Sequence, residues 1–274
     1  MQGRYAAFTF VDRITTLVPG VSARATFHIP ATIRGFPSAL LAEATGQLAA
    51  WVAVAKLDFR LRPVAGIAHE SIYTGAPKPG DTLVTEIRID SCEDDAVAYQ
   101  GTARIADDTV CTLRDCVGPM LPLEDFDDAD AMRAFFATLT TAGAAIDRFE
   151  GVDDLPLDVV EQDVGGRIAA TLDVPDTAGF FADHFPRRPV FPGTLLLDRM
   201  AALADRVVRE LRKPAGSLHR VTDVKLRSFI EPGTRLQLRA SVESADAGRV
   251  TTRVEALAPG QRRPVGAAHL EFAS

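Results

Sequence analysis

The stretch that decides the fold lies at residues 180–193 and reads Phe180-Phe181-Ala182-Asp183-His184-Phe185-Pro186-Arg187-Arg188-Pro189-Val190-Phe191-Pro192-Gly193. It places one histidine in a loop framed by prolines, and an apolar, helix-forming run follows over Thr194–Leu211. Proline is pre-set for helical φ, so a helix should begin at Pro192-Gly193 with its first backbone N–H groups unpaired. Such a helix end can stabilise a developing oxyanion, and His184 beside it can act as a base. The pair suits proton removal next to a thioester carbonyl.

The pattern His-Phe-Pro-x-x-Pro-Val-x-Pro-Gly at 184–193, with acidic Asp198 fourteen positions after the histidine, resembles the bacterial β-hydroxyacyl-acyl-carrier-protein dehydratases of fatty acid synthesis. Every fixed position of the motif matches without a gap. The resemblance implies an α+β hot-dog fold, in which a curved antiparallel sheet wraps a long central helix. It also implies a lyase that needs no cofactor and no metal and removes water from a 3-hydroxyacyl thioester to form a 2-enoyl thioester.

Composition narrows the class of protein. The chain has 274 residues, 47% of them hydrophobic, and its net charge of -7 argues against a general nucleic-acid binder. The first residues lack a signal-peptide apolar core, and no apolar run reaches the roughly twenty residues that span a bilayer, so we expect a cytoplasmic protein. Cys92, Cys111 and Cys116 form no disulfide or metal pattern. Cys111 and Cys116 are five apart, which predicts opposite faces of one strand.

The sequence also contains an internal repeat. Pro37-Ser38-Ala39-Leu40-Leu41-Ala42-Glu43 matches Pro192-Gly193-Thr194-Leu195-Leu196-Leu197-Asp198, and further matches follow in the same order. Each copy reads strand, loop, helix and then several alternating strands. An acidic stretch and a helix over 129–139, with Asp128 as its N-cap, join the copies. We therefore expect a double hot dog, with a first domain at 1–121, a linker at 122–145 and a second domain carrying the motif at 146–274.

The two copies differ in the loop before the helix. Pro30 and Pro37 are seven residues apart in the first copy, whereas Pro175 and Pro192 are seventeen apart in the second. The ten extra residues belong to the loop that carries His184. The first copy therefore lacks a catalytic histidine loop.

In the family, each site takes its histidine from one hot dog and its carboxylate from the central helix of the other. Carried onto this chain, the resemblance pairs His184 with Glu43 and gives one active site per chain. Gln47 lies one turn from Glu43 on the same helix face, whereas the second copy has no glutamine after Asp198. The alternative is that Asp198 is the acid; Asp198 can also simply pair with Arg199.

Each expected site residue has a role. His184 removes the Cα proton, the Gly193 N–H binds the thioester oxygen, and Glu43 helps the hydroxyl leave. We expect the substrate to contact Gln47, Phe185, Pro192 and Asp198.

The expected partner carries an acyl thioester. Ten basic and four acidic residues lie between His184 and Arg227, and such a patch suits an acidic acyl carrier protein or the phosphates of coenzyme A. We expect no nucleic acid and no membrane, and either a monomeric pseudo-dimer or a further homo-oligomer. The competing functions are a non-catalytic thioester-binding or scaffold subunit, an enoyl-CoA hydratase and a thioesterase of the same fold.

Overall fold

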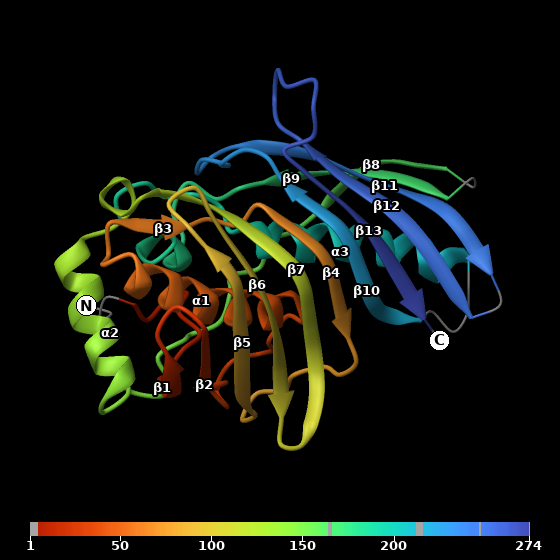
Figure 1. The fold of residues 1–274 in the computed structure, drawn as a ribbon. Helices are drawn as coiled ribbons and strands as arrows, with labels where there is room; N and C mark the ends of the chain where they lie inside the picture. Colours follow the sequence, from red (N-terminus) through yellow and green to blue (C-terminus); the bar gives the residue numbers. More distant parts are fainter. Residues whose placement is uncertain (1–4, 164–165, 212–215, 247, 274) are drawn as a thin grey trace.

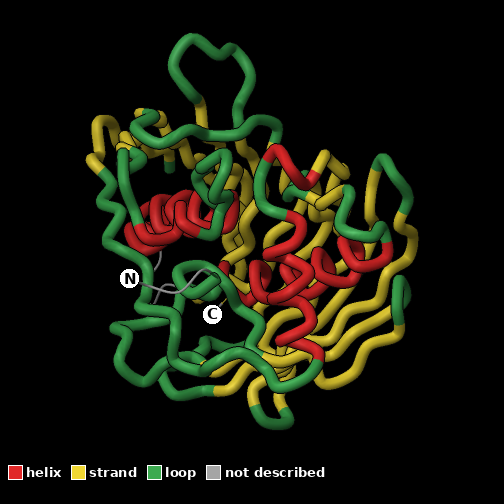
Figure 2. The backbone as a smooth tube through the Cα atoms, turned by 90° about the vertical axis from the view of Figure 1, so that its left-hand side faces the viewer, coloured by secondary structure: helices red, strands yellow, loops and turns green. Residues whose placement is uncertain are grey.

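Two long helices occupy the middle of the molecule, and antiparallel strands curve around them (Figures 1 and 2). The computed structural model describes residues 5–163, 166–211, 216–246 and 248–273. The helices are α1 (Ala39–Lys56) and α3 (Gly193–Leu211), and they contact each other. This arrangement confirms the α+β hot-dog fold that the motif implied.

The strands fall into two groups along the chain. Those of the N-terminal half are β1 (Arg13–Val18), β2 (Ser22–His28), β3 (Leu61–Pro63), β4 (Ile67–Tyr73), β5 (Thr82–Cys92), β6 (Ala96–Ile105) and β7 (Asp108–Pro122). Those of the C-terminal half are β8 (Asp158–Asp163), β9 (Arg167–Asp173), β10 (Ser217–Leu226), β11 (Arg235–Asp246), β12 (Arg249–Leu257) and β13 (Gly266–Ala273). The alternating strands expected after the helix of each copy are therefore present, among them β5 and β6 in the first copy and β11 and β12 in the second.

One sheet runs through both halves in the order β1-β2-β5-β6-β7-β4-β10-β13-β12-β11-β9-β8, and β3 pairs with β7. The halves meet where β4 pairs antiparallel with β10, with Ser71 opposite Val221. Glu70 on β4 is buried at this seam, accepts a hydrogen bond from Arg114 at 2.7 Å and forms an ion pair with Arg220 of the other half. The seam is thus held by main-chain pairing and by a buried carboxylate.

Helix α1 forms because its sequence, ALLAEATGQLAAWVAVAK, is rich in alanine and leucine, which have high helix propensity. Leu40, Leu48 and Val52 are fully buried along it. The helix ends where Asp58 and Phe59 take positive φ angles of 50° and 56°. Helix α1 is buried nearly all round, so a polar side chain on it must find its partners inside the protein.

Helix α3 is amphipathic. Its buried face carries Leu196, Met200, Leu203 and Val207, while Arg209 on the opposite face is exposed and pairs with Asp205. Because Gly193 is its first residue, the helix begins at the Pro192-Gly193 step, as the sequence predicts.

The segment between the halves contains the short helix η1 (Leu123–Asp125) and the helix α2 (Ala129–Thr140). The Asp128 side chain accepts a hydrogen bond from the Ala131 N–H at 2.9 Å, which confirms the expected N-cap. Helix α2 lies on the outside of the molecule beside the N-terminal segment (Figure 1). A second short helix, η2 (Gly179–Ala182), precedes the loop of His184.

The two cysteines of β7 correct one expectation. Cys111 and Cys116 are both buried, although a spacing of five predicted opposite faces. Asp115 between them has a positive φ of 49°, and the pairing of β7 with β6 slips there, so that Tyr99 faces Cys116 while Gly101 faces Leu113. This β-bulge adds one residue and returns Cys116 to the inner face. All three cysteines are free.

In the described part of the chain, none of the helices has the length and apolar character needed to cross a membrane.

Candidate active site

The His184 loop is held by hydrogen bonds within the motif. The His184 N–H donates to the Phe180 carbonyl at 2.9 Å, and the Val190 N–H donates to the His184 carbonyl at 3.2 Å. The imidazole Nδ1 lies 3.1 Å from the Val190 carbonyl oxygen. A carbonyl can only accept, so Nδ1 carries the proton and Nε2 of the neutral ring keeps its lone pair. The loop therefore presents His184 as a base.

The electrostatic surroundings keep His184 neutral. Burial is the largest influence and lowers the pKa of His184 below its usual value, and the nearby cation of Arg62 acts in the same direction. The Glu43 carboxylate and the hydrogen bond to Val190 oppose this shift. A lowered pKa leaves the imidazole unprotonated at neutral pH, which is the state that a general base requires.

Glu43 receives hydrogen bonds from both halves of the chain. Its Oε1 accepts from Gln47 Nε2 at 2.9 Å, and its Oε2 accepts from the Thr194 hydroxyl at 2.7 Å. Gln47 is one turn along α1, while Thr194 lies in the first turn of α3. Gln47 is itself fixed, because its Nε2 also donates to the Phe8 carbonyl and its Oε1 accepts from the Phe10 N–H. Gln47 therefore orients Glu43 and also satisfies backbone groups.

Gly193 begins α3 with its N–H directed out of the helix. In the described part of the chain this N–H makes no hydrogen bond, as expected for the first residue of a helix. A Cβ at this position would come within 2.3 Å of the Leu226 side chain. Glycine thus lets the Leu226 side chain of β10 pack directly against the start of α3, and the Gly193 N–H is a free donor at the positive end of the helix.

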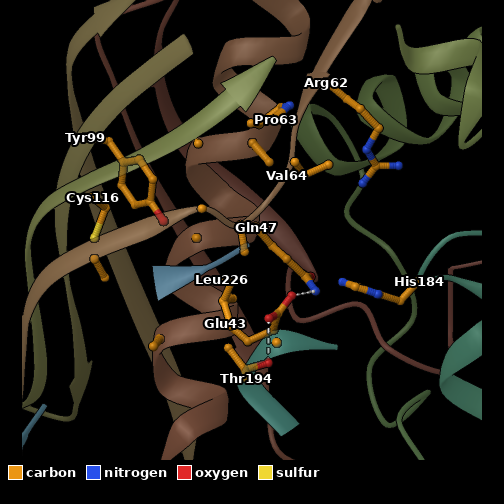
Figure 3. A pocket seen from close by; sticks show the side chains of 18 of the residues that line it. Glu43, Gln47, Arg62, Pro63, Val64, Tyr99, Cys116, His184, Thr194 and Leu226 are labelled. Atoms are coloured by element: carbon orange, nitrogen blue, oxygen red, sulfur yellow. Dashed lines mark hydrogen bonds between the residues drawn. The ribbon is translucent and has the colours of Figure 1, made fainter. Parts of the chain in front are cut away.

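One cavity of about 200 Å³ brings these groups together. His184, Glu43, Gly193, Gln47 and Phe185 all line it. Figure 3 shows His184 pointing across the cavity at Gln47 and Glu43. A base, a carboxylate and a helix-end N–H donor thus face one space between the two halves.

The other expected substrate contacts do not line this cavity. Pro192 directly precedes α3 and does not line the cavity, and its carbonyl accepts a hydrogen bond from the Leu196 N–H at 3.0 Å. Asp198 forms an ion pair with its neighbour Arg199, whose guanidinium also donates to the Leu155 carbonyl. Asp198, the acidic residue of the second copy, is therefore engaged in an ion pair with Arg199.

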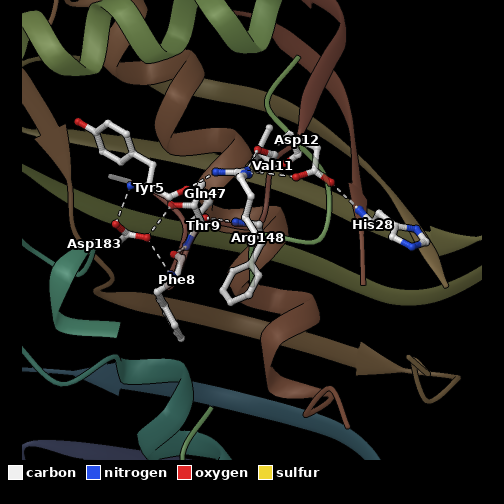
Figure 4. Close-up of polar contacts among 11 residues, drawn as sticks. Tyr5, Phe8, Thr9, Val11, Asp12, His28, Gln47, Arg148 and Asp183 are labelled. Atoms are coloured by element: carbon white, nitrogen blue, oxygen red, sulfur yellow. Dashed lines mark hydrogen bonds and ion pairs between the residues drawn. The ribbon is translucent and has the colours of Figure 1, made fainter. Parts of the chain in front are cut away.

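Sequence reasoning missed the N-terminal segment. The Asp183 carboxylate accepts from the Tyr5 and Phe8 N–H groups, both at 2.8 Å, and from the Thr9 hydroxyl. The Phe8 ring meets the His184 ring edge-on at a centroid distance of 5.6 Å. Figure 4 shows this segment running between Asp183 and Gln47. Asp183, directly before His184 in the sequence, was the one available signal, but a sequence cannot reveal what an aspartate binds.

The same segment is anchored at its far end. Arg148, which precedes β8, donates to the carbonyl oxygens of Tyr5 and Val11 and pairs with the buried Asp12 at 3.1 Å (Figure 4). Asp12 in turn accepts from the His28 N–H. Residues 5–12 are therefore held at both ends, and they form one wall of the site.

The inner end of the cavity is formed by Tyr99 and Cys116, which are partners on β6 and β7 (Figure 3). Burial raises the pKa of Cys116 to about 11, so the thiol stays protonated and unreactive. A Cβ on Gly46 of α1 would come within 3.0 Å of the Tyr99 hydroxyl. Gly46 therefore makes room for the tyrosine at the inner end.

Ion pairs neutralise much of the expected basic patch. Arg187 pairs with Asp128, Arg199 with Asp198, Arg209 with Asp205 and Arg220 with Glu70. Arg212 and Lys213 lie outside the described residues.

Sequence comparison places this hot-dog fold among the dehydratases. Residues 160–260 match the family model of ApeI-like dehydratases. The 3-hydroxyacyl-[acyl-carrier-protein] dehydratase FabZ of Lactiplantibacillus plantarum is 30% identical over 102 residues, which are 36% of this chain and 69% of the relative. That of Ruminiclostridium cellulolyticum is 28% identical over 38% of this chain and 75% of the relative. The chain belongs to the FabZ-like dehydratase family.

Solved structures match nearly the whole chain in fold. A protein assigned as an oleoyl thioesterase from Lactobacillus plantarum aligns with a TM-score of 0.61 and 11% identity, over 92% of this chain and 96% of that one. An acyl-ACP thioesterase from Bacteroides thetaiotaomicron aligns with a TM-score of 0.55 and 12% identity, over 92% and 97%. At such identities the likeness concerns the fold alone.

Proposed function

We propose that this protein is a 3-hydroxyacyl-thioester dehydratase, a lyase that forms a 2-enoyl thioester in fatty acid or polyketide-type synthesis. The observation that carries the proposal is the cavity in which His184, Glu43 and the Gly193 N–H meet. The dehydratase relatives support the same reaction.

The proposed reaction is an elimination. Nε2 of His184 takes the proton from Cα of the 3-hydroxyacyl thioester, and the electron pair left behind forms the double bond as the C3–O bond breaks. The Gly193 N–H hydrogen-bonds the thioester oxygen while negative charge develops there, which for such a donor contributes about 3 kcal/mol. Glu43, protonated or acting through a water, supplies a proton to the departing hydroxyl, which leaves as water.

We further propose that the chain is a double hot dog with one site shared between its halves. The division runs as 1–121, 122–145 and 146–274. Support comes from the pairing of β4 with β10 and from the hydrogen bond that Thr194 of one half donates to Glu43 of the other. The shared site needs the histidine loop of the second half and the acid of the first.

The acyl group is proposed to arrive on an acyl carrier protein or on coenzyme A, in the cytoplasm. The three free cysteines fit a reducing compartment. The enoyl hydratase alternative is the same reaction run backwards through the same groups, so one assay covers both directions.

The test is hydration of crotonyl thioester, presented on acyl carrier protein and on coenzyme A. We expect the wild type to be active and His184→Ala to lose about 1,000-fold in kcat/KM, the effect of a general base. His69→Ala is the matched control, because His69 is exposed and pairs with Asp223 away from the cavity. Full activity in His184→Ala would refute the proposal, and a wild type inactive on both carriers would favour the thioester-binding alternative.

A further inference from the structure

Arg62 on β3 is a cationic side chain of the cavity wall to which the proposed reaction gives no role. It lines the same cavity as His184 and Glu43. Its Nε is buried and has no hydrogen-bond partner. In the described part of the chain, Arg62 makes no side-chain hydrogen bond and no ion pair within 4.0 Å. Arg62 therefore places a cation in the cavity wall, and no described residue supplies a hydrogen-bond acceptor for it.

Arg62 is held in place by an aromatic ring instead of a carboxylate. Its guanidinium carbon lies 4.0 Å from the centroid of the Phe185 ring. The His184 ring stacks on the same Phe185 ring at a centroid distance of 4.2 Å and an interplanar angle of 21°. One face of a six-membered ring has room for one planar group at this distance, so the guanidinium and the imidazole lie on opposite faces. Arg62 is therefore about two stacking distances from the base.

The stack separates Arg62 from the reacting carbons. The Cα proton must lie next to His184, and the thioester oxygen next to Gly193, whereas the guanidinium lies beyond Phe185. Figure 3 shows the Arg62 side chain reaching toward the cavity from the strand above His184. A bound substrate must extend past the base in both directions, toward its carrier and along its acyl chain.

The charge on Arg62 persists although the side chain is buried. Burial lowers the pKa of Arg62 to about 10, while Asp127, Tyr5 and Glu43 oppose that shift. The carboxylate of Asp127 is already engaged, since it accepts from the Tyr5 hydroxyl and the Asp128 N–H. A buried cation without an acceptor is costly, and a guanidinium offers a planar fork of donors suited to oxygen.

We propose that Arg62 binds an acceptor oxygen of the thioester substrate that lies outside the reacting carbons. The oxygen belongs either to an amide of the pantetheine arm or to a polar group on the acyl chain. The inference rests on the proposed function, because it takes the reacting carbons to lie between His184 and Glu43. It adds a specificity-determining residue to that site.

The experiment compares Arg62→Met, which keeps the packing on Phe185 and removes the donors, with the wild type on three substrates. These are crotonyl-pantetheine, S-ethyl crotonothioate without either amide, and glutaconyl-pantetheine, whose acyl chain ends in a carboxylate. Loss of one charge-assisted hydrogen bond is expected to lower kcat/KM about tenfold or more. A loss on both pantetheine thioesters but not on the S-ethyl ester assigns the oxygen to the arm. A loss on glutaconyl-pantetheine alone assigns it to the acyl chain.

Equal activities of wild type and Arg62→Met, or one uniform loss on all three substrates, would overturn the inference. Arg62→Lys covers the case in which the methionine variant does not fold: it keeps the charge without the fork and should give the same substrate pattern with a smaller loss. Arg60→Met is the matched control, because Arg60 lies two residues from Arg62 on the chain and its exposed side chain pairs with Asp94. It should match the wild type on every substrate.

Calorimetry separates failure of this inference from failure of the proposed function. S-butyl-pantetheine and S-(4-carboxybutyl)-pantetheine are unreactive thioethers, so their binding needs no catalysis. The wild type should bind at least one of them about tenfold more tightly than Arg62→Met. If the wild type is catalytically inactive but this difference remains, the reaction is wrong and the role of Arg62 stands. If the enzyme is active and both proteins bind alike, only the role of Arg62 fails.

Discussion

Glu43 on α1 and Asp198 on α3 hold the same place in two copies of one pattern, six residues after the proline that precedes each helix. Their surroundings differ. Glu43 lines the cavity and accepts hydrogen bonds from Gln47 and from Thr194 of the opposite half. Asp198 is paired with Arg199 and lies outside the cavity. Equal positions in a repeat therefore do not give equal chemistry.

The loops that face the two acids explain this difference. The long loop of the second half carries His184 toward Glu43. The short loop of the first half, between Pro30 and Pro37, carries Phe36, which packs edge-on against Phe10 and Phe149 at centroid distances of 5.6 and 6.0 Å. These rings belong to the main hydrophobic core. The long loop thus carries a histidine to the cavity, whereas the short loop contributes an aromatic ring to the core.

Within this comparison of the two acids, the largest expected effect comes from neutralising each of them in turn. Glu43→Gln keeps the shape of the side chain, and Gln47 and Thr194 can still reach it. It removes the proton donor, so kcat/KM for crotonyl-thioester hydration should fall about 100-fold or more. Asp198→Asn should leave kcat/KM unchanged and lower the free energy of unfolding by about 1 kcal/mol, since it weakens a partly exposed ion pair.

The reverse outcome would break the comparison. Activity lost in Asp198→Asn and kept in Glu43→Gln would move the acid to the second copy. Urea denaturation of both variants distinguishes a lost proton donor from a lost fold.

A smaller effect is expected from Gln47→Leu. The substitution leaves the Phe8 carbonyl, the Phe10 N–H and one oxygen of Glu43 without their partner. We expect about a tenfold loss in kcat/KM and about 2 to 4 kcal/mol less unfolding free energy, because buried groups lose hydrogen bonds. Gln100→Leu, which removes an exposed contact with Asp90, is the control and should change neither quantity. An unchanged kcat/KM in Gln47→Leu would mean that Glu43 needs no orientation from its own helix.

The sequence predicted those parts of the site that follow from neighbouring residues or from the motif. It did not predict those that depend on contacts between distant segments of the chain. The helices, the Asp128 cap and the placement of His184 facing Glu43 follow from local pattern, from the motif and from the repeat. Arg62 and Asp183 could not be found in this way, because one acts through the stack on Phe185 and the other through a segment some 175 residues earlier in the chain. The inward turn of Cys116 depends on the bulge at Asp115, which period-two alternation does not predict.

Thr194→Val tests the contact between the halves at one atom. The two side chains are nearly isosteric, so the helix start should persist while Glu43 loses a hydroxyl donor. Because the bond from Gln47 remains, we expect about a threefold loss in kcat/KM and about 1 to 2 kcal/mol less unfolding free energy. Thr138→Val is the control, since that hydroxyl donates to the Ala134 carbonyl of its own helix. If the two substitutions had identical effects on kcat/KM and on the unfolding free energy, Thr194 would have no role in orienting Glu43.

The smallest expected effect is a shift in the titration of His184. Because burial lowers the pKa of His184, the neutral base should persist below pH 6.5, and activity should be lost as pH falls through that lowered pKa. The Glu43 carboxylate raises the same pKa, so Glu43→Gln should move the titration of His184 to still lower pH, whereas Asp198→Asn should not move it. NMR of ¹³C-labelled histidine follows the imidazole directly and needs no residual activity. An upward shift in Glu43→Gln, or a larger shift in Asp198→Asn, would mean that the wrong carboxylate has been paired with the base, since only a charge facing the imidazole can alter its affinity for a proton to this degree.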